Sequence, residues 1–167
     1  AQKQFVQKLP QQNIKLSSSI TPNLMQQEAL SSLEKLRKGN VSKALLISAT
    51  GTGKTYLSAF DIRNFKAKSM LFIVHRENIL IDAQQTFKNV FGADFKSAIF
   101  SGSNRDIAGY DNIFATIQSL SRDHHLTQFS PEAFDYVVID ESHRSGSASY
   151  LKILEYFIKP LNAQLAV

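Results

Sequence analysis

A short run of glycine, hydroxyl-bearing and basic residues is the part of the sequence best suited to chemistry. It extends from Ser48 to Thr55, follows an apolar stretch and precedes residues with helical spacing. Gly51 and Gly53 allow the backbone to bend so that successive amide groups point at phosphate oxygens, and the start of the following helix adds a positive potential. Lys54 is then placed to reach the terminal phosphates, and the Thr55 hydroxyl suits Mg²⁺.

The same run matches the phosphate-loop pattern GxxxxGK[ST] at every fixed position except the first, where Ser48 stands in place of glycine. The backbone of Thr50 and Thr52 completes the expected cradle. A glycine-rich turn with an incidental lysine is the alternative, but a strand before the loop and a helix after it favour the phosphate site. The sequence therefore predicts nucleotide binding.

Two adjacent carboxylates, Asp140 and Glu141, follow the apolar residues Tyr136 to Ile139. We expect this strand to be a parallel neighbour of the strand before the phosphate loop. Asp140 would hold the hydration shell of Mg²⁺, and Glu141 would orient and deprotonate an attacking water. Alone, such a pair is often only the solvated start of a loop, but Lys54 and Thr55 make the catalytic interpretation the better one.

The elements that must position these groups alternate along the chain. Several short runs are apolar throughout instead of alternating with polar residues, which predicts strands buried on both faces. Between them, apolar residues three and four positions apart predict helices. Strand and helix alternation favours a parallel sheet with helices on both faces, whose ligands bind beyond the carboxyl ends of the strands. The predicted strands are Ala44–Ser48, Met70–Val74, Ala98–Phe100, Asn112–Thr116 and Tyr136–Asp140; the predicted helices are one from Leu24 to a stop at Gly39–Asn40, Thr55–Phe65, Glu77–Phe91 and Tyr150–Ile158.

Length and composition narrow the class of protein. The 167 residues, 43% of them hydrophobic, are enough for one compact domain. No apolar stretch is long enough to cross a bilayer and no cysteine is present, so we expect an intracellular, cytoplasmic protein without redox chemistry. The net charge of +5 weakly favours a polyanionic partner, although the lysines are scattered.

Two motifs in this order resemble a known family. Asp140-Glu-Ser-His143 is similar to the DEAH-type motif II of superfamily 2 helicases, with Ser142 in place of the usual alanine, and Ser48 to Thr55 is similar to motif I. The resemblance implies a RecA-like P-loop NTPase domain of the three-layer α/β/α class, with a mainly parallel sheet, that uses ATP and Mg²⁺. It also implies that His143 couples the state of ATP to closure between domains.

Further segments extend the resemblance to most of the chain. Gln26, in Pro22–Leu30, resembles the glutamine that recognises adenine in this family. The segments Phe72–Ile79 and Phe114–Leu120 resemble motifs Ia and Ib, with a small glycine-containing loop between them. On these segments the residues expected to contact nucleic acid are His75, Arg76, Ser101, Gly102, Thr116 and Gln118.

The resemblance looks closest to the restriction-type branch, which resembles type III restriction enzymes and favours DNA over RNA as the partner. We expect residues 1–19 to be an arm or linker and residues 20–167 to be the first RecA-like domain, ending before motif III. The second RecA-like domain, with its arginine finger, is expected elsewhere in the full-length chain. No membrane partner is expected.

The sequence thus predicts a helicase or translocase that couples hydrolysis of Mg-ATP to movement along DNA. A nucleotide-dependent binding module without catalysis is the alternative, and a P-loop kinase or GTPase is less favoured because no guanine-selecting segment is apparent. We interpret the pair His124–His125 as loop histidines rather than metal ligands. The aromatic residues at helical spacing are interpreted as core; they are Tyr56, Phe60, Phe65, Phe87 and Phe91.

Overall fold

The computed structural model describes residues 19–41, 43–45, 53–102, 104–140, 148–157 and 163–166. Helices and strands alternate through most of this chain, as the sequence predicts. In chain order they are α1 (Leu24–Lys38), β1 (Lys43–Leu45), α2 (Lys54–Phe65), β2 (Met70–Val74), α3 (Glu77–Phe91), β3 (Ala98–Phe100), β4 (Asn112–Thr116), α4 (Ile117–Leu120), α5 (Asp123–Leu126), β5 (Tyr136–Ile139), α6 (Ala148–Phe157) and β6 (Ala163–Ala166).

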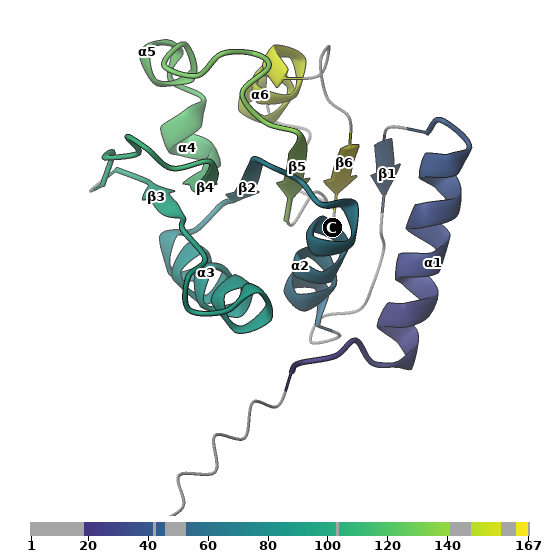
Figure 1. The fold of residues 1–167 in the computed structure, drawn as a ribbon. Coiled ribbons are helices and arrows are strands. Elements are labelled where there is room, and N and C mark those ends of the chain that lie inside the picture. Colours follow the sequence, from purple (N-terminus) through teal and green to yellow (C-terminus); the bar gives the residue numbers. More distant parts are fainter. Residues whose placement is uncertain are drawn as a thin grey trace, which may run out of the picture.

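The strands form one six-stranded sheet in the order β1-β6-β5-β2-β4-β3. Every neighbouring pair is parallel, so all strands end at the same edge. Helices α1, α2 and α3 cover one face, and α4, α5 and α6 cover the other (Figure 1). The predicted α/β fold with three layers is therefore confirmed.

Strand β2 shows why the sheet needs helices on both sides. Its residues are all buried, and they alternate between the two faces because successive side chains of a strand point in opposite directions. Phe72 and Val74 pack with Leu80 and Phe87 of α3. On the other face, the cluster of Leu71 and Ile73 includes Ile117, Leu120, Ile153 and Phe157, from α4 and α6.

The strand order differs from the prediction at one place that matters for the site. The acidic pair was expected on a direct neighbour of the strand before the phosphate loop, but β6 lies between β1 and β5. Sequence patterns indicate which segments are strands, whereas the order of strands depends on how the crossover connections pack. The short apolar run Ala163–Ala166 gives no local sign of a central position.

Several boundaries also differ by small amounts. Helix α2 begins at Lys54, α6 spans Ala148–Phe157, and β5 ends at Ile139, so that Asp140 is the first residue beyond it. Helices α4 and α5 were not predicted, because four residues make about one helical turn and show no periodicity. Residues 46–52, which include part of the predicted first strand, lie outside the described residues.

A hydrogen-bonded cluster of Arg37, Asp61 and Tyr136 connects α1 and α2 to the start of β5. Arg37 donates hydrogen bonds to both carboxylate oxygens of Asp61, at 2.9 Å for the Oδ1 contact, and Tyr136 also donates to Asp61. Arg37 further donates to the Tyr136 hydroxyl at 3.2 Å. Burial and the nearby Asp61 carboxylate raise the pKa of the Tyr136 hydroxyl well above its usual value of 10.0. The phenol therefore stays protonated and remains a donor.

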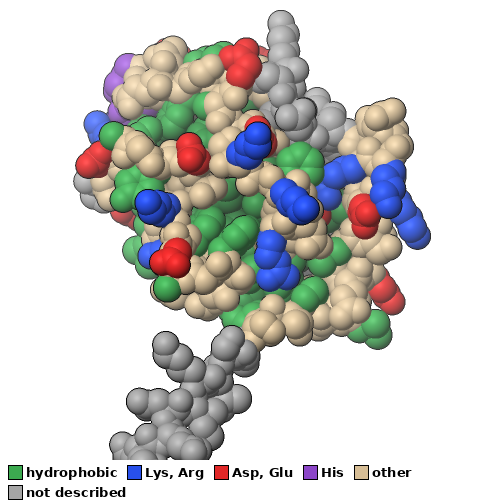
Figure 2. Space-filling view, in the orientation of Figure 1, with side chains coloured by type: hydrophobic (Ala, Val, Ile, Leu, Met, Phe, Trp, Pro, Cys, Tyr) green, Lys and Arg blue, Asp and Glu red, His purple; other side chains and the backbone are tan. Residues whose placement is uncertain are grey.

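The basic side chains are spread over the surface rather than gathered at one site. On the face seen in Figure 2, Lys and Arg side chains lie over α1 and α2 with acidic side chains among them. The last turns of these helices contain Lys35, Arg37 and Lys38 in α1 and Arg63 in α2, where cations complement the helix dipole. No helix in the described ranges is long and apolar enough to cross a membrane.

Candidate functional site

The start of α2 has the geometry expected at the end of a phosphate loop. Gly53 precedes the helix with φ 76° and ψ 35°, the left-handed region that glycine adopts most readily. A Cβ at this position would lie 2.7 Å from Nε2 of Gln26, so the side-chain amide of Gln26 would have to shift. The backbone conformation therefore favours glycine here, and any larger residue would displace the Gln26 amide.

The first turn of α2 leaves its amide groups available to an anion. Gly53 has no side chain that caps the helix, and the first turn contains no acidic residue. Unpaired amide groups and the helix dipole attract phosphate at such a position. Lys54 and Thr55 are the first two residues of the helix and are half-buried. The predicted cradle residues Thr50, Gly51 and Thr52 lie outside the described residues.

Gln26 joins the beginning of α1 to the end of the phosphate loop. Its side-chain oxygen accepts a hydrogen bond from the backbone of Asn23, and the Asn23 side chain accepts one from the backbone of Gln26, each at 2.9 Å. The side-chain nitrogen of Gln26 donates to the carbonyl oxygen of Gly53 at 3.2 Å. A primary amide has two donor and two acceptor positions, so one of each remains for a ligand.

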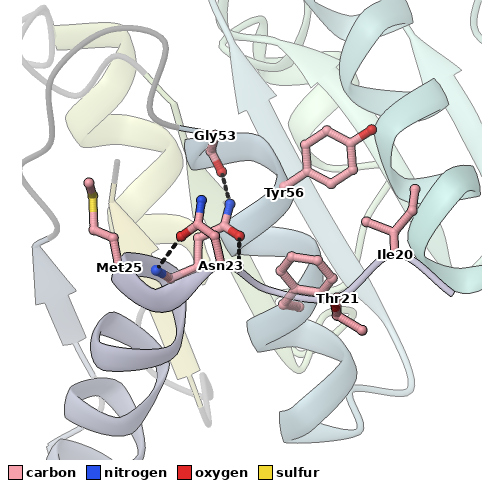
Figure 3. A pocket seen from close by; sticks show the side chains of 8 residues that line it. Ile20, Thr21, Asn23, Met25, Gly53 and Tyr56 are labelled. Carbon is pink, nitrogen blue, oxygen red and sulfur yellow. Dashed lines mark hydrogen bonds between the residues drawn. The ribbon is translucent and has the colours of Figure 1, made fainter. Parts of the chain in front are cut away.

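A cavity of about 540 Å³ opens beside this junction (Figure 3). In Figure 3, Tyr56 reaches the cavity from α2, while Ile20 and Thr21 reach it from the segment before α1. Apolar side chains together with the amides of Asn23 and Gln26 suit a planar heterocycle that needs one hydrogen-bonded edge. The complete lining is Ile20, Thr21, Asn23, Met25, Gln26, Gly53, Tyr56 and Phe60.

Tyr56 is a residue of this cavity that the sequence reasoning missed. Its helical spacing with Phe60 indicates core, and Phe60 is indeed only 1% exposed. Tyr56 is half-buried instead, and its hydroxyl accepts a hydrogen bond from Asn89 of α3 at 3.3 Å. Its position two residues after Lys54 could have indicated a place in the cavity, because the first turn of α2 must border the ligand of the preceding loop. The other aromatic predictions hold for Phe87, which is fully buried, while Phe91 is 36% exposed.

The carboxylate side of the site begins at Asp140. Its backbone nitrogen donates to the carbonyl oxygen of Ile73 at 2.9 Å, which continues the pairing of β5 with β2 for one residue beyond the strand. Asp140 therefore lies at the edge of the sheet where every strand ends. The hydroxyl of Thr55 and the carboxylate of Asp140 are hard oxygen ligands and fit Mg²⁺. Glu141 and His143, also predicted as catalytic, lie outside the described residues.

The residues predicted to contact nucleic acid lie beyond the carboxyl ends of β2, β3 and β4, or at the last position of β4. These three strands are neighbours in the sheet, so the structure brings the three segments together. Arg76, Gly102 and Gln118 are exposed, and His75 is half-buried. Ser101 and Thr116 are buried, with 0% and 5% of their surfaces exposed.

The two buried hydroxyls are already engaged by the protein. Ser101 donates to a carboxylate oxygen of Glu77 at 2.8 Å. Thr116 caps α4: its hydroxyl accepts from the backbone nitrogen of Ser119 and donates to the Ser119 hydroxyl at 2.9 Å. These contacts shape the loops, so the surface that the edge offers to a ligand consists of Arg76, Gly102 and Gln118. Sequence spacing alone gives no indication of this burial.

The adjacent histidines do not form the loop pair that the sequence suggested. They lie on α5, where His124 is exposed and His125 is 2% exposed. The ring of His125 hydrogen-bonds through Nδ1 to the carbonyl oxygen of Ser119 at 2.7 Å and packs edge-on against Phe100. His125 is thus a core residue whose environment the chain sequence alone did not reveal. The described residues contain no cluster of three or more side chains able to hold a metal ion.

Comparison with known proteins gives a family match over almost the whole chain. The sequence model of the family described as "Type III restriction enzyme, res subunit" matches residues 19–166. The chain is 37% identical over 154 residues to "Type I restriction enzyme EcoAI endonuclease subunit" of Escherichia coli, an alignment covering 84% of this chain and 18% of that relative. The chain therefore spans less than a fifth of that relative.

Two solved structures share the fold at lower identity. The first is the Hef helicase domain of Pyrococcus furiosus, with a TM-score of 0.71 and 19% identity, covering 87% of this chain and 32% of that chain. The second is the Sulfolobus solfataricus SWI2/SNF2 ATPase core in complex with dsDNA, with a TM-score of 0.66 and 21% identity, covering 89% and 32%.

Proposed function

The chain belongs to the type III restriction enzyme res-subunit family, and we propose that it is the ATP-binding half of a motor that couples ATP hydrolysis to movement along DNA. One observation carries this proposal. One parallel sheet, whose strands all end at the same edge, positions every part of the site. These parts are the cavity beside Gly53, the carboxylate of Asp140 and the exposed residues after β2, β3 and β4. Ligands of such sheets bind at that edge.

The nucleotide is held by groups from both ends of the cavity. Adenine lies against the apolar wall that includes Tyr56, and the Gln26 amide offers its remaining donor and acceptor to the edge of the base. The phosphates meet the amide groups at the start of α2, with Lys54 neutralising their charge. This arrangement selects ATP over GTP, because the two bases present opposite donor and acceptor groups.

The hydrolytic groups come from the segment that begins at Asp140, directly after β5. When bound, Mg²⁺ neutralises charge on the phosphate oxygens, and Thr55 and Asp140 supply the oxygen atoms that hold it. Glu141 follows Asp140 directly and accepts the proton of the attacking water. His143 transmits the state of the nucleotide to a second RecA-like domain of the longer protein, which completes the cleft with an arginine.

DNA is the polyanion proposed for the loop edge. Arg76 offers a guanidinium, Gln118 offers a side-chain amide, and Gly102 lets a phosphate come close to the backbone. Such groups hold phosphates without reading the base sequence. The preference for DNA over RNA rests on family membership, and the SWI2/SNF2 core of similar fold was solved with dsDNA. Coupling follows from the shared sheet, because β5, which precedes Asp140, is the direct neighbour of β2, which precedes Arg76.

The proposal is tested by steady-state ATP hydrolysis with a protein extended through the second domain. The assay compares no nucleic acid, single-stranded DNA, double-stranded DNA and RNA, with Lys54→Ala as the control for loop-dependent turnover. Stimulation by DNA that disappears in Lys54→Ala supports the motor. If the protein binds nucleotide but no nucleic acid stimulates its ATP hydrolysis, the motor is contradicted. That result favours a binding module whose state is switched by nucleotide binding without hydrolysis.

A further inference from the structure

His75 occupies the position between the two halves of the site. It is the first residue after β2, and β2 lies in the sheet between β5 and β4. On one side, Ile73 pairs with Ile139 and accepts the hydrogen bond from the Asp140 backbone at 2.9 Å. On the other side, Val74 pairs with Thr116. The strand that ends at His75 is therefore the direct connection between the carboxylate strand and the loop after β4.

The imidazole of His75 holds a buried polar atom without a partner. Nε2 is inaccessible to solvent and makes no hydrogen bond within the described part of the chain. It is also the one side-chain nitrogen or oxygen there that is both buried and unpaired. Leaving such an atom unpaired is costly, so a group that supplies the missing bond gains free energy by doing so.

Other polar side chains at the same edge do not share this property. The hydroxyl of Ser101 is paired with Glu77, and that of Thr116 is paired with Ser119. Both of these buried hydroxyl groups thus have hydrogen-bond partners within the protein, whereas Nε2 of His75 has none among the residues that the structure describes. The next residue, Arg76, is exposed and can meet a phosphate directly, whereas a buried Nε2 cannot do so.

We propose that His75 is a positioning residue that couples the nucleic-acid edge to the Asp140 end of β5. Its Nε2 gains a hydrogen-bond partner during the ATP cycle. The bond favours the arrangement in which DNA is bound and the hydrolytic groups are aligned. His75 therefore determines how far DNA accelerates hydrolysis, while Arg76 determines how tightly DNA binds. This inference rests on the proposed motor function.

The test measures two quantities in the full-length protein, namely the maximal DNA-stimulated rate and the DNA concentration that gives half of it. His75→Leu removes the hydrogen bond and keeps an apolar side chain of similar bulk. We expect its maximal stimulation to fall roughly threefold to tenfold, the range of one hydrogen bond, with half-saturation unchanged. His75→Gln retains a nitrogen donor at similar reach and should restore much of the stimulation. Arg76→Ala should show the opposite pattern, a raised half-saturation with little change in the maximum.

Thermal unfolding without ligands supplies a readout independent of turnover. His75→Leu removes the unpaired atom, so its melting temperature should equal or exceed that of the parent protein. A lower melting temperature together with a general loss of activity would show that His75 is only structural, and would overturn the inference. The same holds if His75→Leu keeps full stimulation or merely raises half-saturation as Arg76→Ala does. A parent protein that DNA does not stimulate would overturn the proposed function itself, and this inference with it.

Discussion

The side-chain nitrogen of Gln26 donates a hydrogen bond to the carbonyl oxygen of Gly53 at 3.2 Å, across 27 positions of sequence. This contact joins the residue expected to read the base to the loop expected to hold the phosphates. The same amide completes the capping box with Asn23 at the start of α1. Stability of α1 and geometry of the nucleotide site therefore depend on one side chain.

Substitution of Gln26 should separate these two roles. Gln26→Ala removes the hydrogen bonds to Asn23 and Gly53, so we expect a loss of about 1–2 kcal/mol in the free energy of unfolding together with weaker ATP binding and less discrimination against GTP. Gln26→Glu keeps the acceptor for the Asn23 backbone but loses the donor to Gly53. It should retain most of the stability and still bind ATP weakly. Equal ATP affinity in all three proteins, measured by titration of a fluorescent nucleotide, would contradict this role.

Gly53→Ala should displace the side-chain amide of Gln26 in addition to straining the backbone. Gly109 provides the matched control, because its φ of +80° resembles the +76° of Gly53 but a Cβ there meets nothing within 4 Å. Gly109→Ala should cost about 1–2 kcal/mol through backbone strain alone. Gly53→Ala adds the clash with Gln26, so its loss should be larger and should include nucleotide binding. Adding Gln26→Ala to Gly53→Ala should recover part of the stability; the absence of any recovery in thermal unfolding would count against the clash.

Tyr136 should make the free energy of unfolding depend on pH in the alkaline range. Its pKa is raised in the folded chain, so the unfolded chain releases the proton first as the pH rises. The resulting stabilisation is present below pH 10.0 and is lost as the pH climbs above 10.0 toward the folded pKa. Tyr136→Phe should lower the free energy of unfolding at neutral pH by about 1.5–3 kcal/mol and remove this alkaline dependence. Denaturant titrations of both proteins across this range would disprove the assignment if the two curves ran parallel.

The salt dependence of DNA binding should distinguish exposed from buried residues of the loop edge. Arg76→Ala removes an exposed cation, so the affinity should fall and the slope of log affinity against log salt should decrease by about 1. Ser101→Ala removes a hydroxyl that is fully buried and bonded to Glu77, so the slope should not change. Binding by fluorescence anisotropy at several salt concentrations measures both. A slope unaffected by Arg76→Ala would place the DNA elsewhere.

The 167-residue chain by itself should bind ATP weakly and hydrolyse it slowly. It contains the phosphate loop and the acidic pair, but an arginine supplied across the cleft stabilises the charge of the transition state in motors of this kind. A malachite-green assay of released phosphate, with Lys54→Ala as the blank, gives the rate. Fast turnover stimulated by DNA in this chain would show that no second domain is needed.

Much of the fold was predictable because buried parallel strands have a strong pattern. The boundaries of β2, β3 and β4 and of α3 agree with the prediction, since most of their apolar residues are buried against helices or neighbouring strands. The central place of β6 was not predictable, because strand order arises from crossover packing rather than from local sequence. Tyr56 packs against the core cluster of Leu30, Leu57 and Phe60, as predicted, but it also lines the cavity, which helical spacing does not reveal.

Site residues were predictable by type more readily than by exposure. Gln26 and Gly53 lie side by side at the starts of α1 and α2, and Asp140 directly follows β5. The burial of Ser101 and Thr116 depends on partners in α3 and α4, and such contacts leave no trace in the spacing of a single sequence.

The position of β6 makes the order of synthesis matter. Among the described strands, β1 pairs with β6 alone, so the strand that leads to the phosphate loop joins the sheet only through residues 163–166. A ribosome must therefore translate this stretch before the strand at Lys43–Leu45 has a place to dock. Until then the hydrogen-bonding edge of β5 that later pairs with β6 has no strand beside it.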